Sequence, residues 1–247
     1  MKYLQNTAIW LTALLLFAFS GCNQKPAGEH TFAIGNKTFL LDGKPFVIKA
    51  AEIHYTRIPA EYWEHRIQLC KALGMNTICI YAFWNIHEQK PGEFDFSGQN
   101  DIAAFCRLAQ KYDMYIMLRP GPYVCSEWEM GGLPWWLLKK DDIKLRTNDP
   151  YFLERTKLFM NEIGKQLADL QITKGGNIIM VQVENEYGSY ATDKEYIANI
   201  RDIVKGAGFT KHRPRRLGMD HQFRYGSQYR RTIQETERST PQHPAHV

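Results

Sequence analysis

The sequence predicts an α/β fold in which strands and helices alternate along the chain. Short apolar runs recur, and each is followed by a segment with helical periodicity. Polar and aromatic residues cluster directly after these runs, at the strand ends where α/β folds place their chemistry. The 247 residues suffice for one large domain or two small ones, and a hydrophobic content of 44% supports a well-packed core. A (β/α)8 barrel and a doubly wound sheet both begin with such units.

The first 22 residues predict an export signal. Lys2 precedes an apolar run over Ile9–Phe19, which is too short and too close to the start for an ordinary spanning helix. The residues 19–22 are similar to a bacterial lipoprotein signal, in which Cys22 becomes the lipidated first residue and attaches the protein to a membrane. Phe19 departs from the aliphatic residue usual there, so secretion without a lipid is the alternative. We expect a bacterial protein that is exported to the periplasm or anchored to the outer membrane as a lipoprotein.

A polar linker over residues 23–30 leads into the folded part. Phe32–Phe46 predicts a β-hairpin with Asp42-Gly43 as its turn. Phe46–Tyr55 predicts the first long strand. Polar and aromatic residues close this strand: Glu52, His54 and Tyr55.

The alternation of strands and helices continues along the chain. A helix opens at Pro59-Ala60-Glu61. Its predicted apolar stripe comprises Trp63, Ile67, Cys70 and Gly74. Thr77–Tyr81 predicts the second strand, which runs into Trp84–Glu88, and Asp101–Tyr112 predicts the following helix.

The last two units complete a set of four. Tyr115–Leu118 predicts the third strand, and Pro150–Leu170 the helix after it. Asn177–Val181 predicts a fourth strand that is apolar on both faces, which suits a buried parallel sheet. Lys194–Gly206 predicts the fourth helix, closed by glycines. No glycine-rich phosphate fingerprint follows the first strand, which weakens the nucleotide-binding, doubly wound alternative.

The loops after the third and fourth strands carry the candidate chemistry. The first of these loops contains Glu127, Trp128, Glu129, Trp135 and Trp136. Tryptophans beside carboxylates favour a sugar site, although Trp135 and Trp136 are equally compatible with core packing. The second contains Glu184, Asn185 and Glu186, which are costly to bury unless they act on something. A polar cap on a strand end is the alternative.

Charge and cysteine usage exclude several classes of protein. Residues 1–210 carry 23 Lys+Arg and 23 Asp+Glu, and the whole net charge of +5 lies in residues 211–247. This distribution argues against a nucleic-acid-binding face on the main domain. Free buried thiols are favoured over disulfides for three cysteines in apolar patterns: Cys70, Cys79 and Cys106. The cysteines and histidines do not have metal-ligand spacing.

Three motifs carry a resemblance to a known family: Ile80–Glu88, Leu118–Pro134 and Val181–Gly188. Through them, residues 31–210 resemble the N-terminal half of the catalytic barrel of the β-galactosidases of glycoside hydrolase family 35. The resemblance implies a (β/α)8 TIM barrel of which about the first four β-α units are present. It also implies a retaining, exo-acting hydrolase that removes terminal β-linked galactose from an oligosaccharide or glycan, with no metal or organic cofactor.

The resemblance assigns roles to individual residues. Glu186 is the implied general acid/base, and Asn185 binds the sugar 2-hydroxyl. Residues implied to line or adjoin the galactose pocket are Tyr81, Cys125, Glu127, Glu184 and Asn185. A retaining glycosidase also needs a second carboxylate, roughly 5–5.5 Å from the first, as nucleophile. In the family this is a glutamate on the seventh strand, which we expect to be missing here, so we expect little hydrolysis by this chain alone.

Residues 211–247 differ in character from the rest, being basic and without helical or strand periodicity. One interpretation is a cationic tail that binds an anionic surface. The other is a frameshift: back-translation of residues 212–247, read from the second base of each codon, allows strings similar to the family's continuation. We favour the frameshift, and a stop codon in that frame of the DNA would contradict it.

Two other functions stay open at this stage. One is a galactoside-binding protein that retains Tyr81, Glu127 and Asn185 without turnover. The other is a barrel glycosidase that acts on β-glucosyl or β-glucosaminyl ends.

Overall fold

The computed structural model describes residues 28–209. The predicted export signal with Cys22 and the basic tail over 211–247 lie outside these residues and stay predictions. Four strands form a parallel sheet: β4 (Ala50–Glu52), β5 (Thr77–Tyr81), β6 (Tyr115–Arg119) and β7 (Ile178–Val181). Their order in the sheet is their order in the chain. A doubly wound sheet requires a reversal of strand order, so the sequential order identifies four consecutive units of an α/β barrel.

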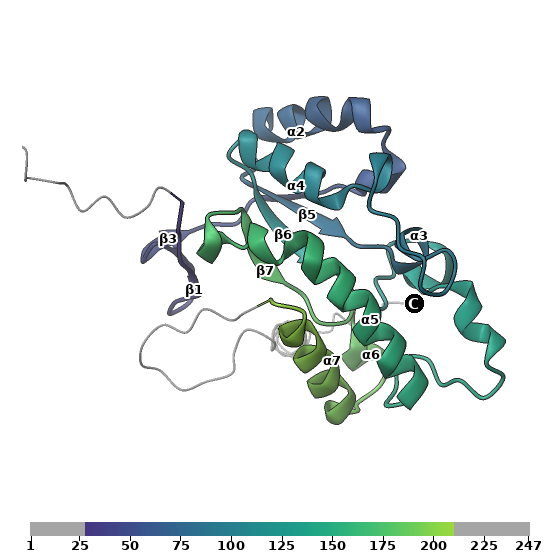
Figure 1. Cartoon of the computed structure of the whole chain (residues 1–247). Helices are drawn as coiled ribbons and strands as arrows, with labels where there is room; N and C mark the ends of the chain where they lie inside the picture. Colours follow the sequence, from purple (N-terminus) through teal and green to yellow (C-terminus); the bar gives the residue numbers. More distant parts are fainter. Residues whose placement is uncertain (1–27, 210–247) are drawn as a thin grey trace, which may run out of the picture.

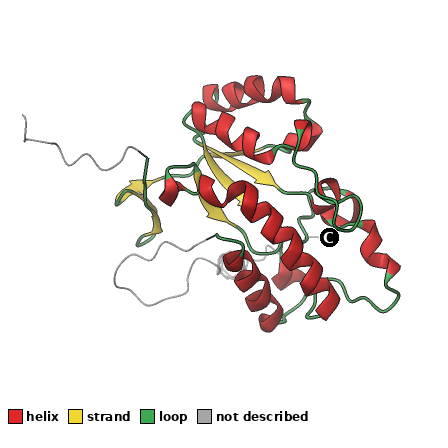
Figure 2. Cartoon of the chain, viewed as in Figure 1, coloured by secondary structure: helices red, strands yellow, loops and turns green. Residues whose placement is uncertain are grey.

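One long helix follows each strand (Figures 1 and 2): α2 (Trp63–Ala72), α4 (Ile102–Lys111), α5 (Pro150–Leu167) and α7 (Lys194–Gly206). Each packs against the next, which continues the arc of the sheet. The aspartates before α4, α5 and α7 accept hydrogen bonds from backbone N–H groups of the first turn and so fix where these helices begin. In residues 28–209 no helix is long and apolar enough to cross a membrane.

Shorter elements connect these units. Two are single-turn α-helices, α3 (Trp84–His87) and α6 (Tyr187–Tyr190). The 3-10 segments are η1 (Tyr55–Arg57), η2 (Ala60–Tyr62), η3 (Gly98–Asn100), η4 (Glu129–Gly132), η5 (Trp135–Lys139), η6 (Ala168–Leu170) and η7 (Ile172–Lys174). Most of them lie in segments for which the sequence predicts no regular structure.

Side chains on the sheet alternate between two environments. In β6, Ile116 and Leu118 are fully buried among the helices. Tyr115, Met117 and Arg119 point to the opposite, inner face, because successive side chains of a strand alternate. The register pairs Tyr81 with Arg119 at the carboxyl ends of β5 and β6. The strand geometry alone therefore brings these two side chains together.

A small antiparallel sheet lies at the other end of the strands (Figure 1). It consists of β1 (Phe32–Ile34), β2 (Phe39–Leu41) and β3 (Lys44–Phe46). The predicted hairpin with its Asp42-Gly43 turn joins β2 to β3, and β1 adds a third strand. The phenyl ring of Phe46 packs edge-on against Tyr115 at the start of β6, with ring centroids 5.4 Å apart. This sheet thus covers the amino-terminal ends of the barrel strands.

Two predicted elements need correction. The strand predicted over Phe46–Tyr55 comprises only Ala50–Glu52. Before Ala50, the Asn76 side chain forms hydrogen bonds with the backbone groups that a longer strand would use. Its amide accepts from Lys49 N at 2.9 Å and donates to Val47 O at 2.8 Å. Gly74 is not part of the apolar stripe of α2; it is exposed and its φ of 80° ends the helix in the left-handed conformation.

Candidate functional site

Arg119 connects the carboxyl ends of all four barrel strands. Its guanidinium donates hydrogen bonds to the Tyr81 hydroxyl and the Asn185 side-chain oxygen, and to Gln182 Oε1 at 2.5 Å. The Tyr81 hydroxyl in turn donates to Glu52 Oε2 at the end of β4, at 2.7 Å. The same guanidinium lies over the Tyr81 ring, 4.3 Å from its centroid. Tyr81 and Asn185, both predicted site residues, are therefore joined through one cation.

A second arginine anchors the loop that carries Glu186. Arg146 Nη2 forms an ion pair with Glu184 Oε2 at 2.7 Å, in which both side chains are buried. Its Nη2 also donates to the Asn185 carbonyl at 2.7 Å. Glu184 accepts two further bonds, from the Tyr196 hydroxyl at 2.6 Å and from Asn185 N at 2.8 Å. A buried carboxylate needs such partners, and here they fix the backbone directly before Glu186.

The Glu184 environment also affects its neighbour Tyr196. Burial, with the adjacent Glu184 carboxylate as the second cause, raises the pKa of the Tyr196 phenol well above its usual value. Tyr196 therefore stays a hydrogen-bond donor at any physiological pH. It belongs to α7, so the hydrogen bond ties the end of β7 to the helix that follows it.

Left-handed backbone is concentrated around this site. Seven of the ten non-glycine residues with positive φ in the described chain lie in its loops: Cys125, Ser126, Glu127, Met130, Arg146, Glu184 and Glu186. Each such residue costs of order 1–3 kcal/mol and persists only where surrounding contacts hold it. Arg57 supplies two of those contacts, donating from Nη2 to Ser126 O at 3.1 Å and to Glu127 O at 2.9 Å. Strained residues cluster at active sites and ligand-binding loops, so their concentration here supports a functional site.

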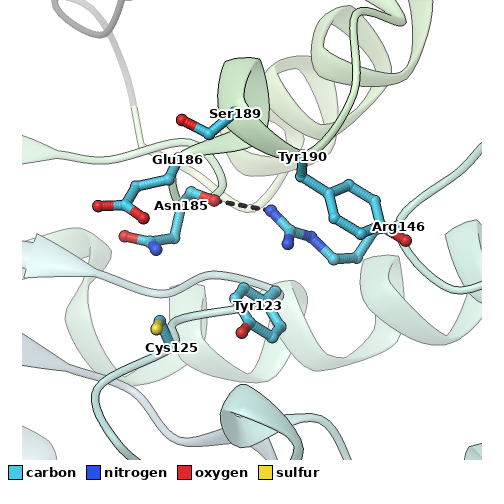
Figure 3. A pocket seen from close by; sticks show the side chains of 7 residues that line it. All are labelled: Tyr123, Cys125, Arg146, Asn185, Glu186, Ser189 and Tyr190. Carbon is cyan, nitrogen blue, oxygen red and sulfur yellow. Dashed lines mark hydrogen bonds between the residues drawn. The ribbon is translucent and has the colours of Figure 1, made fainter.

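A cavity opens beside Glu186 (Figure 3). Its lining residues are Tyr123, Cys125, Arg146, Asn185, Glu186, Ser189 and Tyr190. The Arg146 guanidinium carbon lies 4.0 Å from the Tyr123 ring centroid and 4.2 Å from that of Tyr190. Glu186 starts α6 without capping it through its side chain, and the residue is exposed. The carboxyl of Glu186 is thus available to a ligand in the cavity.

Of the other predicted site residues, some line this cavity and others lie apart from it. Cys125 and Asn185 line it, whereas Tyr81 and Glu127 do not. Tyr81 is buried beside Arg119, and Glu127 is exposed in the loop held by Arg57. Glu184 adjoins the cavity, but its carboxylate is fully engaged with Arg146 and Tyr196. A direct contact of these residues with a sugar stays a prediction.

Trp135 and Trp136, which the sequence leaves equally compatible with a sugar site and with core packing, differ from each other in the structure. Trp136 is 2% exposed and donates its indole N–H to the Glu88 carbonyl at 2.9 Å, so it is a core residue. Trp135 is 54% exposed, with the Lys139 ammonium over its ring. Glu88 is itself buried, paired with Arg155 and bonded to Trp84 Nε1 at 2.6 Å. The thiols of Cys70, Cys79, Cys106 and Cys125 are free, as predicted for the first three, although Cys70 is only half-buried.

Arg119 and Arg146 are site residues that were not predicted from the sequence. Arg119 stands in one of the quoted motifs, at a strand end where functional side chains gather, so its position could have identified it. Arg146 lies in a loop without a motif, 38 residues before Glu184. A buried Glu184 requires a cation, but the sequence offers no means of choosing which arginine supplies it.

Comparison with known proteins gives concordant results. The sequence profile of Glycosyl hydrolases family 35 matches residues 38–242. A β-galactosidase of Xanthomonas manihotis is 44% identical over 208 residues, covering 84% of this chain and 35% of that protein. Beta-galactosidase 8 of Oryza sativa subsp. japonica is 42% identical over 198 residues, covering 79% and 29%. The chain therefore spans about a third of the length of the curated relatives it matches.

A solved structure shares the fold. It is the exo-β-1,4-mannosidase Op5Man5 from Opitutaceae bacterium strain TAV5, with a TM-score of 0.53 and 19% sequence identity. The match covers 67% of this chain and 30% of that one. At this identity the likeness concerns the architecture alone, and it agrees with a partial α/β barrel.

Proposed function

The chain belongs to glycosyl hydrolases family 35, and on that premise we propose that it forms the acid/base half of a retaining exo-β-galactosidase active site. In this proposal Glu186 is the general acid/base and Asn185 binds the 2-hydroxyl of a terminal β-linked galactose. The supporting observation is that Asn185 and Glu186 lie in the short loop after β7 and line the same cavity, with the Asn185 side chain oriented by Arg119.

The hydrogen bonds around Asn185 support the role assigned to it. Its side-chain oxygen accepts from Arg119, and its Nδ2 makes no hydrogen bond with residues 28–209. The amide therefore offers its N–H donors to a sugar oxygen. Arg119 fixes which end of the amide faces outward, because a guanidinium donates only. Binding and orienting the sugar is thus a task that residues of this chain suit.

Glu186 supports the proton-transfer role by position. Its carboxyl is at the cavity, where it can give a proton to the leaving oxygen and later take one from water. Glu184 does not suit the role of nucleophile, since Arg146, Tyr196 and Asn185 N already occupy its oxygens. We propose that the nucleophilic carboxylate comes from a part of the barrel beyond residues 28–209. Hydrolysis by the 247-residue chain alone is then expected to be slight.

The test uses the full-length protein that the frameshift hypothesis predicts, expressed from the coding DNA in the shifted frame. Glu186→Gln should lower kcat strongly for alkyl galactosides, whose leaving oxygen needs protonation. It should affect glycosylation by an activated aryl galactoside much less. Glu154→Gln, at an exposed glutamate on α5 outside the candidate site, is the matched control and should change neither. Equal losses with every leaving group would contradict the acid role.

A non-catalytic galactoside-binding protein is the second candidate function. It is favoured by the presence of Tyr81, Arg119 and Asn185 in one connected group in a chain that spans about a third of its relatives. It predicts saturable binding of galactose without hydrolysis, measured by calorimetry on the 247-residue chain. The absence of heat at millimolar galactose would dismiss it. A preference of the frame-restored protein for aryl β-glucosides over aryl β-galactosides would instead favour the alternative sugar specificity.

Export and lipidation at Cys22 belong to the same proposal, because an extracytoplasmic glycan is the substrate expected. Mass spectrometry of the mature N-terminus distinguishes the two forms of export. A diacylglyceryl group on Cys22 is the expected result, and an unmodified N-terminus would indicate free secretion. Sequencing the DNA downstream of Gly208 decides between the frameshift and a genuine basic tail, and deletion of 211–247 tests any anionic-surface binding.

A further inference from the structure

Glu52 ends β4 with a carboxylate that has no part in the proposed proton transfer. Its Oε2 accepts a hydrogen bond from the Tyr81 hydroxyl at 2.7 Å and lies 3.5 Å from Arg119 Nη1. Its Oε1 lies 3.0 Å from His54 Nε2. The His54 ring in turn packs edge-on against the Tyr81 ring, with ring centroids 5.0 Å apart. Three neighbours thus hold the Glu52 carboxylate in place, although 47% of its side chain is exposed.

These contacts fix the direction of the hydrogen bonds at the Tyr81 hydroxyl. A guanidinium only donates, so the hydroxyl oxygen accepts from Arg119. An ionised carboxylate only accepts, so the hydroxyl proton goes to Glu52. A phenol has a single proton to give, and Glu52 already takes it. The Tyr81 oxygen can therefore offer a further partner only a lone pair.

Together the Tyr81 hydroxyl oxygen and the Glu52 carboxylate form an acceptor corner at the ends of β4 and β5. Arg119 directs its Nη1 to these two groups and its Nη2 to the Asn185 side chain. One guanidinium thus separates the acceptor corner from Asn185, which lines the cavity. A sugar ring that Asn185 binds and that extends past Arg119 meets the acceptor corner with one of its hydroxyls.

We propose that Glu52 is a positioning residue that determines specificity, because by taking the Tyr81 proton it makes the acceptor corner recognise a ligand hydroxyl that donates. The inference rests on the proposed function, in which Tyr81 belongs to the galactose site. A hydroxyl both donates and accepts, whereas a fluorine or an ether oxygen on the same carbon cannot donate. The site therefore takes a terminal sugar whose hydroxyl at the acceptor corner is free of substituents.

Deoxy and fluoro analogues of galactose test the direction of this hydrogen bond on the 247-residue chain. The probes are galactose and the analogues in which its 2-, 3-, 4- or 6-hydroxyl is replaced by hydrogen or by fluorine, titrated by calorimetry. At the position that meets the acceptor corner, both replacements should weaken binding about tenfold or more, the loss expected for a hydrogen bond to a charged acceptor. Fluorine should bring no recovery there, because it does not donate.

Variants of Glu52 provide a readout that a merely structural role would not move. Glu52→Ala frees the Tyr81 proton, so the fluoro analogue at that position should bind more tightly than the deoxy analogue. Its tenfold loss relative to galactose should shrink to about threefold or less. Glu52→Gln, whose side-chain oxygen can still accept from Tyr81, should restore most of the wild-type pattern. Glu61→Ala, at an exposed glutamate on η2, is the matched control and should keep that pattern fully.

The outcomes separate this inference from the proposed function. If galactose binds and the fluoro analogue at every position binds as tightly as galactose, the acceptor corner is overturned while the galactose site stands. Unchanged ratios among the analogues in Glu52→Ala would make Glu52 purely structural, which also overturns the inference. If neither galactose nor any analogue binds, the galactose site itself is overturned, and the role of Glu52 with it.

Discussion

Gly164 in α5 provides a test in which two physical effects have opposite signs. Alanine in a helix interior is favoured over glycine by about 0.8–1.0 kcal/mol, so propensity alone predicts that Gly164→Ala stabilises the protein. In the structure, a Cβ on Gly164 would lie 1.9 Å from the Ala207 carbonyl oxygen and 2.9 Å from its carbon. Ordinary contact begins at 3.4 Å, so α5 and the end of α7 would have to separate by about 1.5 Å.

Forced overpacking of this kind typically costs about 1–3 kcal/mol, and here the obstacle is backbone rather than a flexible side chain. Taking the upper part of that range, about 2–3 kcal/mol, we expect Gly164→Ala to destabilise by about 1–2 kcal/mol after the propensity gain. Urea unfolding followed by tryptophan fluorescence measures it. Gly206→Ala, at the end of α7, meets nothing within 4 Å and should be neutral or stabilising by up to about 1 kcal/mol. A Gly164→Ala variant as stable as the wild type would refute the close approach of α5 and α7.

Three further predictions concern buried groups. Arg146→Met should lower the unfolding free energy by about 3–5 kcal/mol, because it leaves the Glu184 charge buried and unpaired. Adding Glu184→Gln to this variant should restore part of the lost stability. A double variant without any recovery would contradict the pairing. Burial lowers the pKa of His87 to about 4 from 6.5, so the unfolded chain takes up a proton that the folded chain does not. The unfolding free energy should therefore fall by about 3 kcal/mol between pH 6.5 and 4, and His87→Gln should flatten this part of the urea-midpoint profile. Burial raises the pKa of the Cys79 thiol to about 11 and raises that of the Cys106 thiol further. In the native protein both thiols should therefore react with iodoacetamide more slowly than Cys125, which lines the cavity. Peptide mass spectrometry measures the three rates.

Periodicity in the sequence was sufficient to place the barrel units. The strand at Thr77–Tyr81 and the helix at Lys194–Gly206 occur with the predicted bounds, because each is set by its own apolar pattern and by local caps. The first barrel strand was predicted too long, because its amino-terminal limit is set by hydrogen bonds to Asn76, more than twenty residues away in the chain. Side-chain contacts of that range leave no local pattern to detect.

The residues of the candidate site likewise divide into those that the sequence could predict and those that it could not. Glu186 and Asn185 could be singled out because they follow a buried strand, and Tyr81 because it ends another. Arg119 ends a strand within a motif and could have been singled out in the same way, whereas Arg146 lies in a loop without a motif and acts on Glu184 from 38 residues away, so it could not. The sequence likewise could not distinguish Trp135 from Trp136, since adjacent aromatic residues in an irregular loop have no period to assign their faces.

The placement of the β1–β3 sheet at the amino-terminal ends of the barrel strands has a consequence for how this protein can vary. Phe46 and Tyr115 meet at one end of β6, while Arg119 and its partners meet at the other. Effects of substitutions at well-separated sites without shared partners are usually additive. Changes in the small sheet should therefore alter thermal tolerance without altering the proposed sugar site, while changes around Arg119 should act on that proposed site. Selection can then adapt the stability of the protein and the proposed site independently.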